Sequence, residues 1–258
     1  MNLVLIIPTL NSYTLLPKLI NSLKKQTFIN WKLIFVDGNS SREHKKWLEE
    51  QCCIDKRLSF INQIDTNLGI YGAMIEGVNK VNMSDWILFW GSDDWAFSEN
   101  IFEKIVKKIN SYYKNNFEPD LIICNGKYVN NKGKIIRSSN FSIFKTFRLS
   151  LFLGSVPAHQ ATIFNAKLIK NKISFKTEYE LASDLDLFLR MSSIKNLKIK
   201  TLNLDIVNIA PGGISNRLFA NRIYEVYNAY KSSFGLFWLI PFSIRYLKKL
   251  VGYLSIFN

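Results

Sequence analysis

Cysteine and histidine are both scarce in this sequence of 258 residues. The three cysteines are Cys52, Cys53 and Cys124, and the two histidines are His44 and His159. An odd number of cysteines with one adjacent pair fits neither a disulfide framework nor the paired spacing of a structural zinc site. We therefore expect a protein without disulfides that works in a reducing, cytoplasmic setting.

Acidic residues are few in comparison with basic ones. Lys and Arg number 34 and Asp and Glu 20, which gives a formal net charge of +14. Such a charge favours an anionic partner: a nucleic acid, a phosphorylated small molecule or an anionic membrane surface. No expected helix carries a dense basic stripe, and no zinc-finger or stacked-aromatic pattern occurs, so we predict no binding to nucleic acid.

Long uncharged hydrophobic runs are absent as well. The longest, at residues 232–244, has about 13 residues, short of the roughly 20 that a helix needs to cross a bilayer. The surrounding segment is rich in aromatic and aliphatic residues and contains Arg245, Lys248 and Lys249, which suits a helix lying in the interface of an anionic membrane. The alternative is a pair of helices that packs on the domain or on a second copy. The start, Met1–Pro8, lacks the basic flank and the apolar length of a signal peptide and is predicted to be a strand.

What the sequence does contain is a regular alternation of strand and helix patterns. Apolar, β-rich runs at Leu3–Ile7, Lys32–Val36 and Trp86–Trp90 are typical of central strands in a parallel sheet. Helical patterns lie between them, which predicts an α/β fold with an open, mostly parallel sheet flanked by helices. The further elements expected in this half are strands at Leu58–Gln63 and Asp120–Cys124 and helices at Tyr13–Lys25, Ser40–Gln51, Ile70–Val81 and Glu99–Tyr113, the last behind a Ser98 cap.

The second half is less regular. Lys127–Val129 and Lys134–Arg137 flank a turn signal and predict a hairpin. Helices are expected at Asp184–Met191 and Asn216–Ser233, and Pro241 is expected to break the final apolar segment.

Polar residues follow the strands of the first half. The first strand leads into Pro8–Ser12, the second into Asp37–Ser40, and the Trp86 strand into Gly91–Asp94. Ligands of open α/β sheets bind beyond the carboxyl ends of the strands, so we expect these clusters to converge at one edge. The sequence argues against a dehydrogenase, because the first strand does not lead into a glycine-rich turn.

Adjacent carboxylates at Asp93 and Asp94 repel one another when both are ionised, and a divalent cation removes that conflict. Oxygen ligands of this kind suit Mg²⁺ or Mn²⁺ that is completed by phosphates and water. The alternative is a helix cap, in which Asp94 or Ser98 accepts backbone hydrogen bonds at the start of the Glu99 helix. His44 falls on a helix expected to be polar and exposed, and we assign it no function.

Four motifs, in this order and spacing, resemble glycosyltransferase family 2, whose fold is GT-A: Pro8–Asn11, Val36–Ser40, Asn67–Met74 and Gly91–Asp94. The resemblance implies that Thr9 and Asp37 contact uracil, that Asp93 contacts the ribose or donor sugar, and that Asp94 binds Mn²⁺ or Mg²⁺. The donor-nucleotide residues that it implies are Pro8, Thr9, Asn11, Asp37, Asn67, Gly69, Ser92 and Asp93.

Two segments of the second half, Pro157–Phe164 and Tyr179–Arg190, resemble family members that assemble bacterial surface polysaccharides. The resemblance implies that Asp184 is the general base, since displacement of a nucleotide by an acceptor hydroxyl requires that hydroxyl to lose a proton. The alternative for Asp184 is an acid favoured by the dipole of its helix. Candidate acceptor or phosphate contacts are His159, Asp186 and Arg190; His159 is also a candidate metal contact, and Arg190 could instead pair with a neighbouring acid. A short motif at Gly212–Ser215 resembles a loop that closes over bound donor.

The sequence therefore predicts an inverting transferase that moves a hexose or N-acetylhexosamine from a UDP-sugar to a polyprenyl-diphosphate-linked glycan. It would act in surface polysaccharide synthesis, at the inner leaflet of the plasma membrane. The expected domains are a catalytic domain at 1–215, with a nucleotide-sugar half at 1–125 and an acceptor half at 126–215, and a helical membrane-associating segment at 216–258. The alternative is a non-catalytic nucleotide-sugar or glycan-binding module, which has no chemical need for Asp184. No oligomeric state is predicted.

Overall fold

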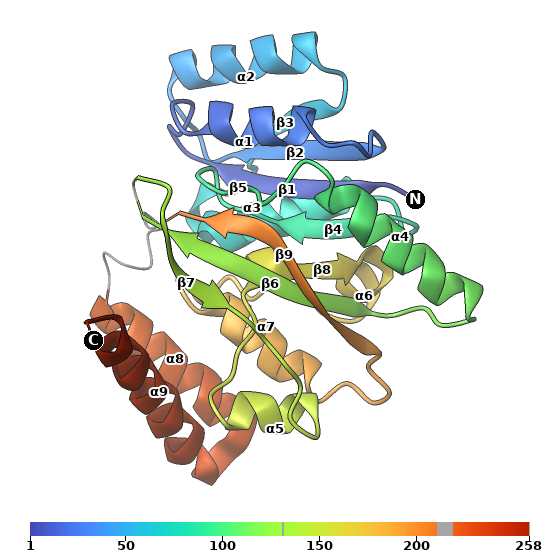
Figure 1. The fold of residues 1–258 in the computed structure, drawn as a ribbon. Helices are drawn as coiled ribbons and strands as arrows, with labels where there is room; N and C mark the ends of the chain where they lie inside the picture. Colours follow the sequence, from blue (N-terminus) through green and yellow to red (C-terminus); the bar gives the residue numbers. More distant parts are fainter. Residues whose placement is uncertain (131, 211–218, 258) are drawn as a thin grey trace.

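The computed structural model describes residues 1–130, 132–210 and 219–257, and it shows one mixed sheet with helices on both faces (Figure 1). Among these residues the sheet has nine strands in the order β3-β2-β1-β4-β8-β6-β9-β5, with β7 paired to β6. The strands are β1 (Leu3–Thr9), β2 (Trp31–Asp37), β3 (Leu58–Asn62), β4 (Trp86–Phe89), β5 (Trp95–Ala96), β6 (Leu121–Val129), β7 (Ile135–Ser139), β8 (Thr162–Asn165) and β9 (Ile199–Ile209).

The first half of the sheet is parallel, as predicted. β1 pairs with β2 on one side and with β4 on the other, and β3 extends the sheet beyond β2. The chain thus builds outward through β2 and β3 and then returns to the other side of β1. A ligand crevice forms at such a reversal of strand order, beyond the carboxyl ends of the strands. The fold therefore places the polar ends of β1, β2 and β4 around one crevice.

The second half of the sheet mixes directions. β8 is antiparallel to both β4 and β6, whereas β9 runs parallel to β6. The predicted hairpin is present as β6 and β7, but β6 is longer than expected because the runs at Asp120–Cys124 and Lys127–Val129 form one strand. Neither β8 nor β9 was predicted, so "mostly parallel" describes only the first half.

Helices cover both faces of the sheet. Along β1, Leu3, Leu5 and Ile7 face one core, while Val4 and Ile6 face the other, which explains the unbroken apolar run. The helices are α1 (Leu16–Lys24), α2 (Arg42–Ile54), α3 (Gly69–Asn79), α4 (Ile101–Lys114), α5 (Phe147–Phe152), α6 (Ala166–Asn171), α7 (Ser183–Met191), α8 (Phe219–Phe234) and α9 (Leu239–Phe257).

Two local predictions were wrong. Helix α4 begins after Asn100 without a side-chain cap, so Ser98 is not its cap. Pro241 does not end a helix but lies in the first turn of α9, where its missing N–H costs no helical hydrogen bond.

The C-terminal helices α8 and α9 form a hairpin that packs against α5 and α7 (Figure 1). Val226, Ala229 and Tyr230 of α8 are buried in the same core as α7, and Trp238 and Phe242 pack against it. The inner face of the hairpin therefore belongs to the main core. The expected boundary at 215/216 and the Gly212–Ser215 motif lie outside the described residues.

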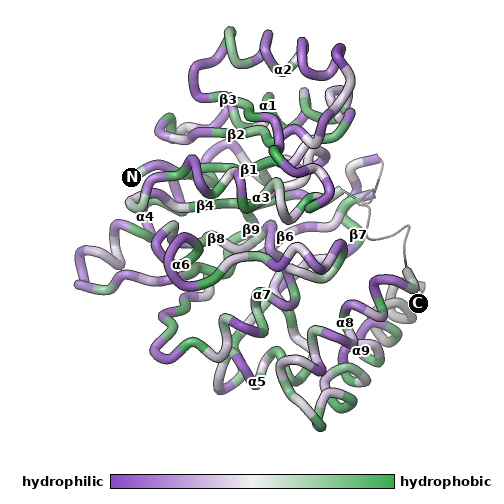
Figure 2. The backbone as a smooth tube through the Cα atoms, turned by 180° about the vertical axis from the view of Figure 1, so that it is seen from behind, coloured by the Kyte–Doolittle hydropathy of each residue, from purple (hydrophilic) through white to green (hydrophobic). Residues whose placement is uncertain are grey.

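Hydrophobic residues continue along the hairpin in Figure 2. No helix in the described part of the chain combines the length and the hydrophobicity that crossing a membrane requires.

One carboxylate ties the hairpin to the start of α7. Glu225 accepts hydrogen bonds from the backbone amides of Glu180, Leu181 and Ala182 at 2.8–2.9 Å. These amides precede α7 and have no partner within it. Glu225 thereby fixes the position of α7 relative to α8.

We predict that Glu225→Ala lowers the free energy of unfolding by about 2 kcal/mol, because amides bound to a charged acceptor lose that partner. Urea denaturation measures the change. Glu180→Ala is the matched control, since the Glu180 side chain is exposed and contributes only its backbone amide. Equal stability of the two variants would contradict the assignment.

Candidate active site

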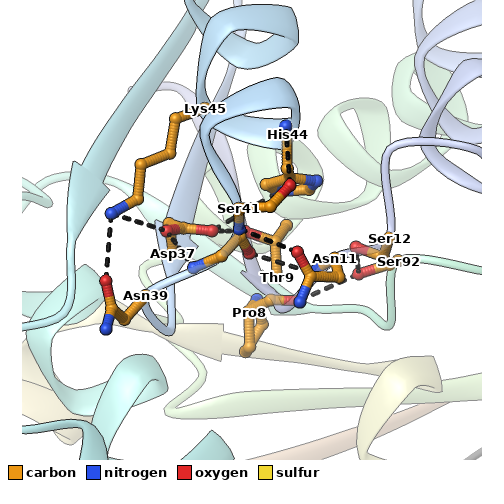
Figure 3. A network of polar contacts seen from close by, with 11 residues as sticks. Pro8, Thr9, Asn11, Ser12, Asp37, Asn39, Ser41, His44, Lys45 and Ser92 are labelled. Carbon is orange, nitrogen blue, oxygen red and sulfur yellow. Dashed lines mark hydrogen bonds and ion pairs between the residues drawn. The ribbon is translucent and has the colours of Figure 1, made fainter.

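The loops after β1 and β2 are joined by side-chain hydrogen bonds (Figure 3). The amide of Asn11 donates to Ser40 Oγ at 2.8 Å, and Asn11 Oδ1 accepts from the amide of Ser41 at 2.8 Å. Asn11 and Asn39 both have positive φ, a conformation that Asn tolerates better than most residues. The choice of Asn at these turns allows the two loops to meet.

A second set of bonds joins the β1 loop to the β4 loop. The hydroxyls of Ser12 and Ser92 lie 3.0 Å apart, and Ser92 Oγ donates to the carbonyl oxygen of Pro8 at 3.0 Å. The predicted convergence of the three strand ends is therefore present in the fold (Figure 3).

Asp37 holds these loops from inside. Its carboxylate is fully buried and accepts hydrogen bonds from the amide of Ser40 at 2.9 Å and from Thr9 Oγ1 at 3.4 Å. Lys45 Nζ lies 3.9 Å from Oδ2, the oxygen that also accepts from Ser40. Asp37 thus holds the turn after β2 in place, and its direct contact with uracil stays a prediction.

The expectation that His44 is exposed was wrong. The ring is fully buried, with Nε2 3.4 Å from Asp37 Oδ1 (Figure 3). Burial lowers the pKa of His44, while the charge of Asp37 acts in the opposite direction. The sequence signal was helical spacing, because His44 lies four residues before Leu48, which the periodicity had already assigned to the inner face.

The Asn67–Gly69 segment is exposed at the edge of this region. Gly69 has a φ of +58°, and Gln63 Nε2 donates to its carbonyl oxygen at 2.9 Å. The next residues connect the segment to α7, because the hydroxyl of Tyr71 lies beside the backbone amide of Asp184. Burial, and then the charge of Asp184, raise the pKa of Tyr71, a contact that sequence reasoning missed.

Asp94 is the buried member of the acidic pair. Its Oδ2 accepts from the amide of Gly91 at 2.7 Å and its Oδ1 from the amide of Ala210 at 3.2 Å, so it does not cap α4. Burial, and then the charge of Asp93, raise the pKa of Asp94 to about 7. Asp93 is only half-buried and has no hydrogen bond to its carboxylate among the described residues.

The pair provides a partial set of metal ligands. A Cβ on Gly91 would lie 2.8 Å from Asp93 Oδ1 and 3.2 Å from Asp94 Oδ2, so both carboxylates rest against this glycine. Within the described ranges no three His, Cys, Asp or Glu side chains surround a cation site. One or two carboxylates suffice for Mg²⁺ or Mn²⁺ that takes its other ligands from phosphates and water, so the pair fits such an ion.

Asp184 lies in the first turn of α7 and is paired with His159. Its Oδ2 lies 3.3 Å from His159 Nδ1, and its Oδ1 accepts from the amide of Leu185 at 2.8 Å. Desolvation raises the pKa of Asp184, but the hydrogen bond and charge of His159 outweigh it, and the net shift is downward. The charge of His159 also reaches Asp94. Asp94, His159 and Asp184, which are distant in sequence, are thus close to one another in the fold. Asp184 also lies in the first turn of its helix, the position that the helix-dipole alternative requires.

Asp186 and Arg190 are engaged with one another. Arg190 Nε donates to Asp186 Oδ2 at 2.6 Å, and Arg190 Nη2 donates to the carbonyl oxygen of Ser174 at 2.7 Å. Asp186 is only 2% exposed. The structure therefore does not bring these two candidates into the group formed by Asp94, His159 and Asp184.

We predict that Asp93→Asn raises the free energy of unfolding at pH 8 by about 1 kcal/mol and changes it little at pH 5. The folded state keeps a proton on Asp94 up to about pH 7, whereas the unfolded chain releases it near 3.8, so stability falls as pH rises through this window. Removing the charge of Asp93 reduces that loss. Urea denaturation at both pH values measures the free energy of unfolding, and Glu50→Gln, at an exposed position, is the control. If Asp93→Asn lowered the stability at pH 8, the electrostatic coupling of Asp93 to Asp94 would be contradicted.

Comparison with known proteins agrees with this geometry. The sequence model of the family described as "Glycosyl transferase family 2" matches residues 4–171. A "PGL/p-HBAD biosynthesis glycosyltransferase" of Mycobacterium bovis is 27% identical over 219 residues, which cover 83% of this chain and 79% of that protein. A "GalNAc(5)-diNAcBac-PP-undecaprenol beta-1,3-glucosyltransferase" of Campylobacter jejuni is 26% identical over 65% of this chain and 52% of its own length.

Solved structures share the fold. The TarS fragment 1–349 of S. aureus in complex with UDP-GlcNAc has a TM-score of 0.66 at 18% identity, covering 91% of this chain and 68% of that one. A mannosyltransferase of Pyrobaculum calidifontis, in complex with GDP-Man and Mn²⁺, has a TM-score of 0.64 at 12% identity, covering 95% and 69%. At these identities the likeness concerns the fold, which is GT-A. With the family model matching well over half of its length, the chain belongs to glycosyl transferase family 2 and is a glycosyltransferase.

Proposed function

We propose that this glycosyltransferase moves a hexose or N-acetylhexosamine from a UDP-sugar to an acceptor hydroxyl with inversion at the anomeric carbon. The observation that carries the proposal is the 3.3 Å pair of Asp184 and His159, which lies within reach of the Asp93/Asp94 pair. A non-catalytic binding module would need no base at this place.

The donor would lie across the ends of β1, β2 and β4. Mn²⁺ or Mg²⁺ held by Asp94, with Asp93 facing the ribose or donor sugar, would neutralise charge on the departing UDP. The complex of TarS with UDP-GlcNAc supports a UDP-sugar on this fold. The residues that we propose for the nucleotide side are Pro8, Thr9, Asn11, Asp37, Asn67, Gly69 and Ser92.

Asp184 would act as the general base. It removes the proton from the acceptor hydroxyl while the hydroxyl oxygen bonds to the anomeric carbon and the bond to UDP breaks. Attack opposite to the departing diphosphate inverts the anomeric centre. The lowered pKa keeps Asp184 ionised at neutral pH, and His159 holds it in that state.

The acceptor that we propose is a glycan joined to a polyprenyl diphosphate, used in surface polysaccharide synthesis. The name of the Campylobacter jejuni relative supports it, since it specifies an acceptor on undecaprenol. Such an acceptor lies at the inner leaflet of the plasma membrane, so the enzyme would bind there peripherally.

The outer face of α9 supports this membrane contact. Leu239, Ile240, Leu247 and Leu250 are each 47–59% exposed, and their spacing places them along one side of the helix. Lys248 is exposed next to this apolar stripe. A helix with this pattern suits an anionic interface, while its inner face remains packed on the protein.

We predict UDP release from at least one UDP-sugar, dependent on Mn²⁺ or Mg²⁺, in the presence of a lipid-diphosphate monosaccharide. Asp184→Asn should lower kcat about 1000-fold, because loss of a general base costs that order of rate. Asp186→Asn should keep most of kcat and lower stability, because Asp186 pairs with Arg190. No metal-dependent UDP release with any donor would overturn the transferase, and full activity of Asp184→Asn would overturn only the base.

The same assay tests the role of His159. His159→Gln removes the charge that lowers the pKa of Asp184, so this pKa rises and the acid limb of the kcat/KM profile moves to higher pH. A limb that does not move would show that His159 does not act through Asp184.

For the membrane, we predict that the wild-type protein co-sediments with vesicles containing anionic phospholipid. Leu247→Ser with Leu250→Ser should reduce the bound fraction several-fold, because apolar area is lost from the interface. Ile64→Ser is the matched control, since Ile64 is 92% exposed on a distant loop. If the wild type, the double variant and Ile64→Ser bound the vesicles equally, the proposal that α9 contacts the membrane would be overturned.

A further inference from the structure

Four cationic side chains from three elements lie close enough to act on one another electrostatically, and Asp184 of α7 lies within the same range. Arg137 comes from β7, Arg222 from α8, and Arg245 and Lys249 from α9; we call them the cationic cluster. Arg245 and Lys249 are four residues apart and share one face of their helix. The hairpin brings the second half of α9 back to the start of α8 (Figure 1). The charge of Arg137 reaches Lys249 from β7.

The frame that holds the cluster is fixed by packing. A Cβ on Gly154 would come within 2.8 Å of Arg245 Cα, so the backbone of α9 lies directly against the segment after α5. Arg222 precedes Glu225 by one turn of α8, and Glu225 is bonded to the amides before α7. The guanidinium of Arg137 stacks on the ring of Tyr128 at 4.2 Å. These contacts position the charges without neutralising them.

No member of the cluster forms an ion pair with an acid among the residues that the structure describes. The Nε of Arg245 is buried and has no hydrogen-bond partner there. The two nearby acids, Glu225 and Asp184, already have other partners. Both carboxylate oxygens of Glu225 accept hydrogen bonds from backbone amides, and Asp184 is paired with His159. The cluster therefore carries uncompensated positive charge.

The charges are close enough to perturb one another and Asp184. Desolvation, and then the three guanidinium groups, lower the pKa of Lys249, while Asp184 acts in the opposite direction. The Lys249 side chain itself is exposed and open to a ligand. The charge of Arg222 in turn helps to lower the pKa of Asp184. Like charges held together in this way favour an anion with several oxygens, and Arg groups suit phosphate in particular.

We propose that Arg137, Arg222, Arg245 and Lys249 bind a diphosphate group next to Asp184, and that this group joins a lipid carrier to the acceptor sugar. The assignment to the acceptor rests on the proposed function, in which Asp184 meets the acceptor hydroxyl. The position supports it, because three of the four members lie on the hairpin that carries the exposed apolar stripe, and none lies at the ends of β1 and β2. The other source of the same chemistry is the diphosphate of the donor nucleotide.

Binding of water-soluble farnesyl diphosphate and of UDP, measured by calorimetry without divalent metal, tests the proposal. The double variant Arg222→Gln, Lys249→Gln should weaken farnesyl diphosphate binding at least tenfold and leave UDP within twofold. The double variant Lys104→Gln, Lys108→Gln removes two charges from exposed positions on α4 and should change neither. Farnesol, which lacks the diphosphate, should bind all three proteins weakly and equally.

Unchanged binding of farnesyl diphosphate to the Arg222/Lys249 double variant, at wild-type thermal stability, would overturn the site. If the double variant lost binding of UDP but not of farnesyl diphosphate, the assignment of the cluster to the acceptor would be overturned. The cluster would then bind the diphosphate of the donor nucleotide. The measurement needs no turnover, so retained diphosphate binding without sugar transfer would overturn the proposed function and not the site.

Discussion

Carboxylates that accept hydrogen bonds from backbone amides hold together the loops around the site. Asp37 binds the amide of Ser40, Asp94 binds the amides of Gly91 and Ala210, and Glu225 binds the amides before α7. A backbone amide without a partner is costly when buried, so each of these acids fixes a segment that has no regular structure of its own. The same acids therefore serve stability first; among them Asp94 is also the candidate metal ligand and Asp37 a candidate contact of the nucleotide.

Charge is distributed unevenly across the crevice. On the β4 side two carboxylates crowd one another, and on the hairpin side four cations do so, with Asp184 and His159 between them. Each concentration of like charge is a cost in the free protein that a ligand of opposite sign removes. A substrate pair with a metal-bound diphosphate at one end and a second diphosphate at the other would match this arrangement.

The sequence predicted those parts in which local pattern and tertiary role agree. The parallel strands β1, β2 and β4 are buried on both faces, so each could be recognised in the sequence as an unbroken apolar run. The polar residues at their ends then predicted where the crevice lies. β8 is only four residues long and follows a short 3-10 helix, which gave no periodicity to detect. β9 alternates between sheet contacts and a partly exposed face, and its pairing with β6 is interrupted by bulges. His44 and Glu225 escaped notice because their partners, Asp37 and the amides before α7, are adjacent only in the folded chain.

The bond between Glu225 and the start of α7 gives the C-terminal hairpin a mechanical role. In the proposed membrane-bound state, the hairpin would touch both the lipid surface and, through Glu225, the start of the helix that carries Asp184. A tilt of the hairpin at the lipid surface would then shift the start of α7. Evolution of a new acceptor in this scaffold would accordingly require the hairpin and α7 to change together, while the donor half stays as it is.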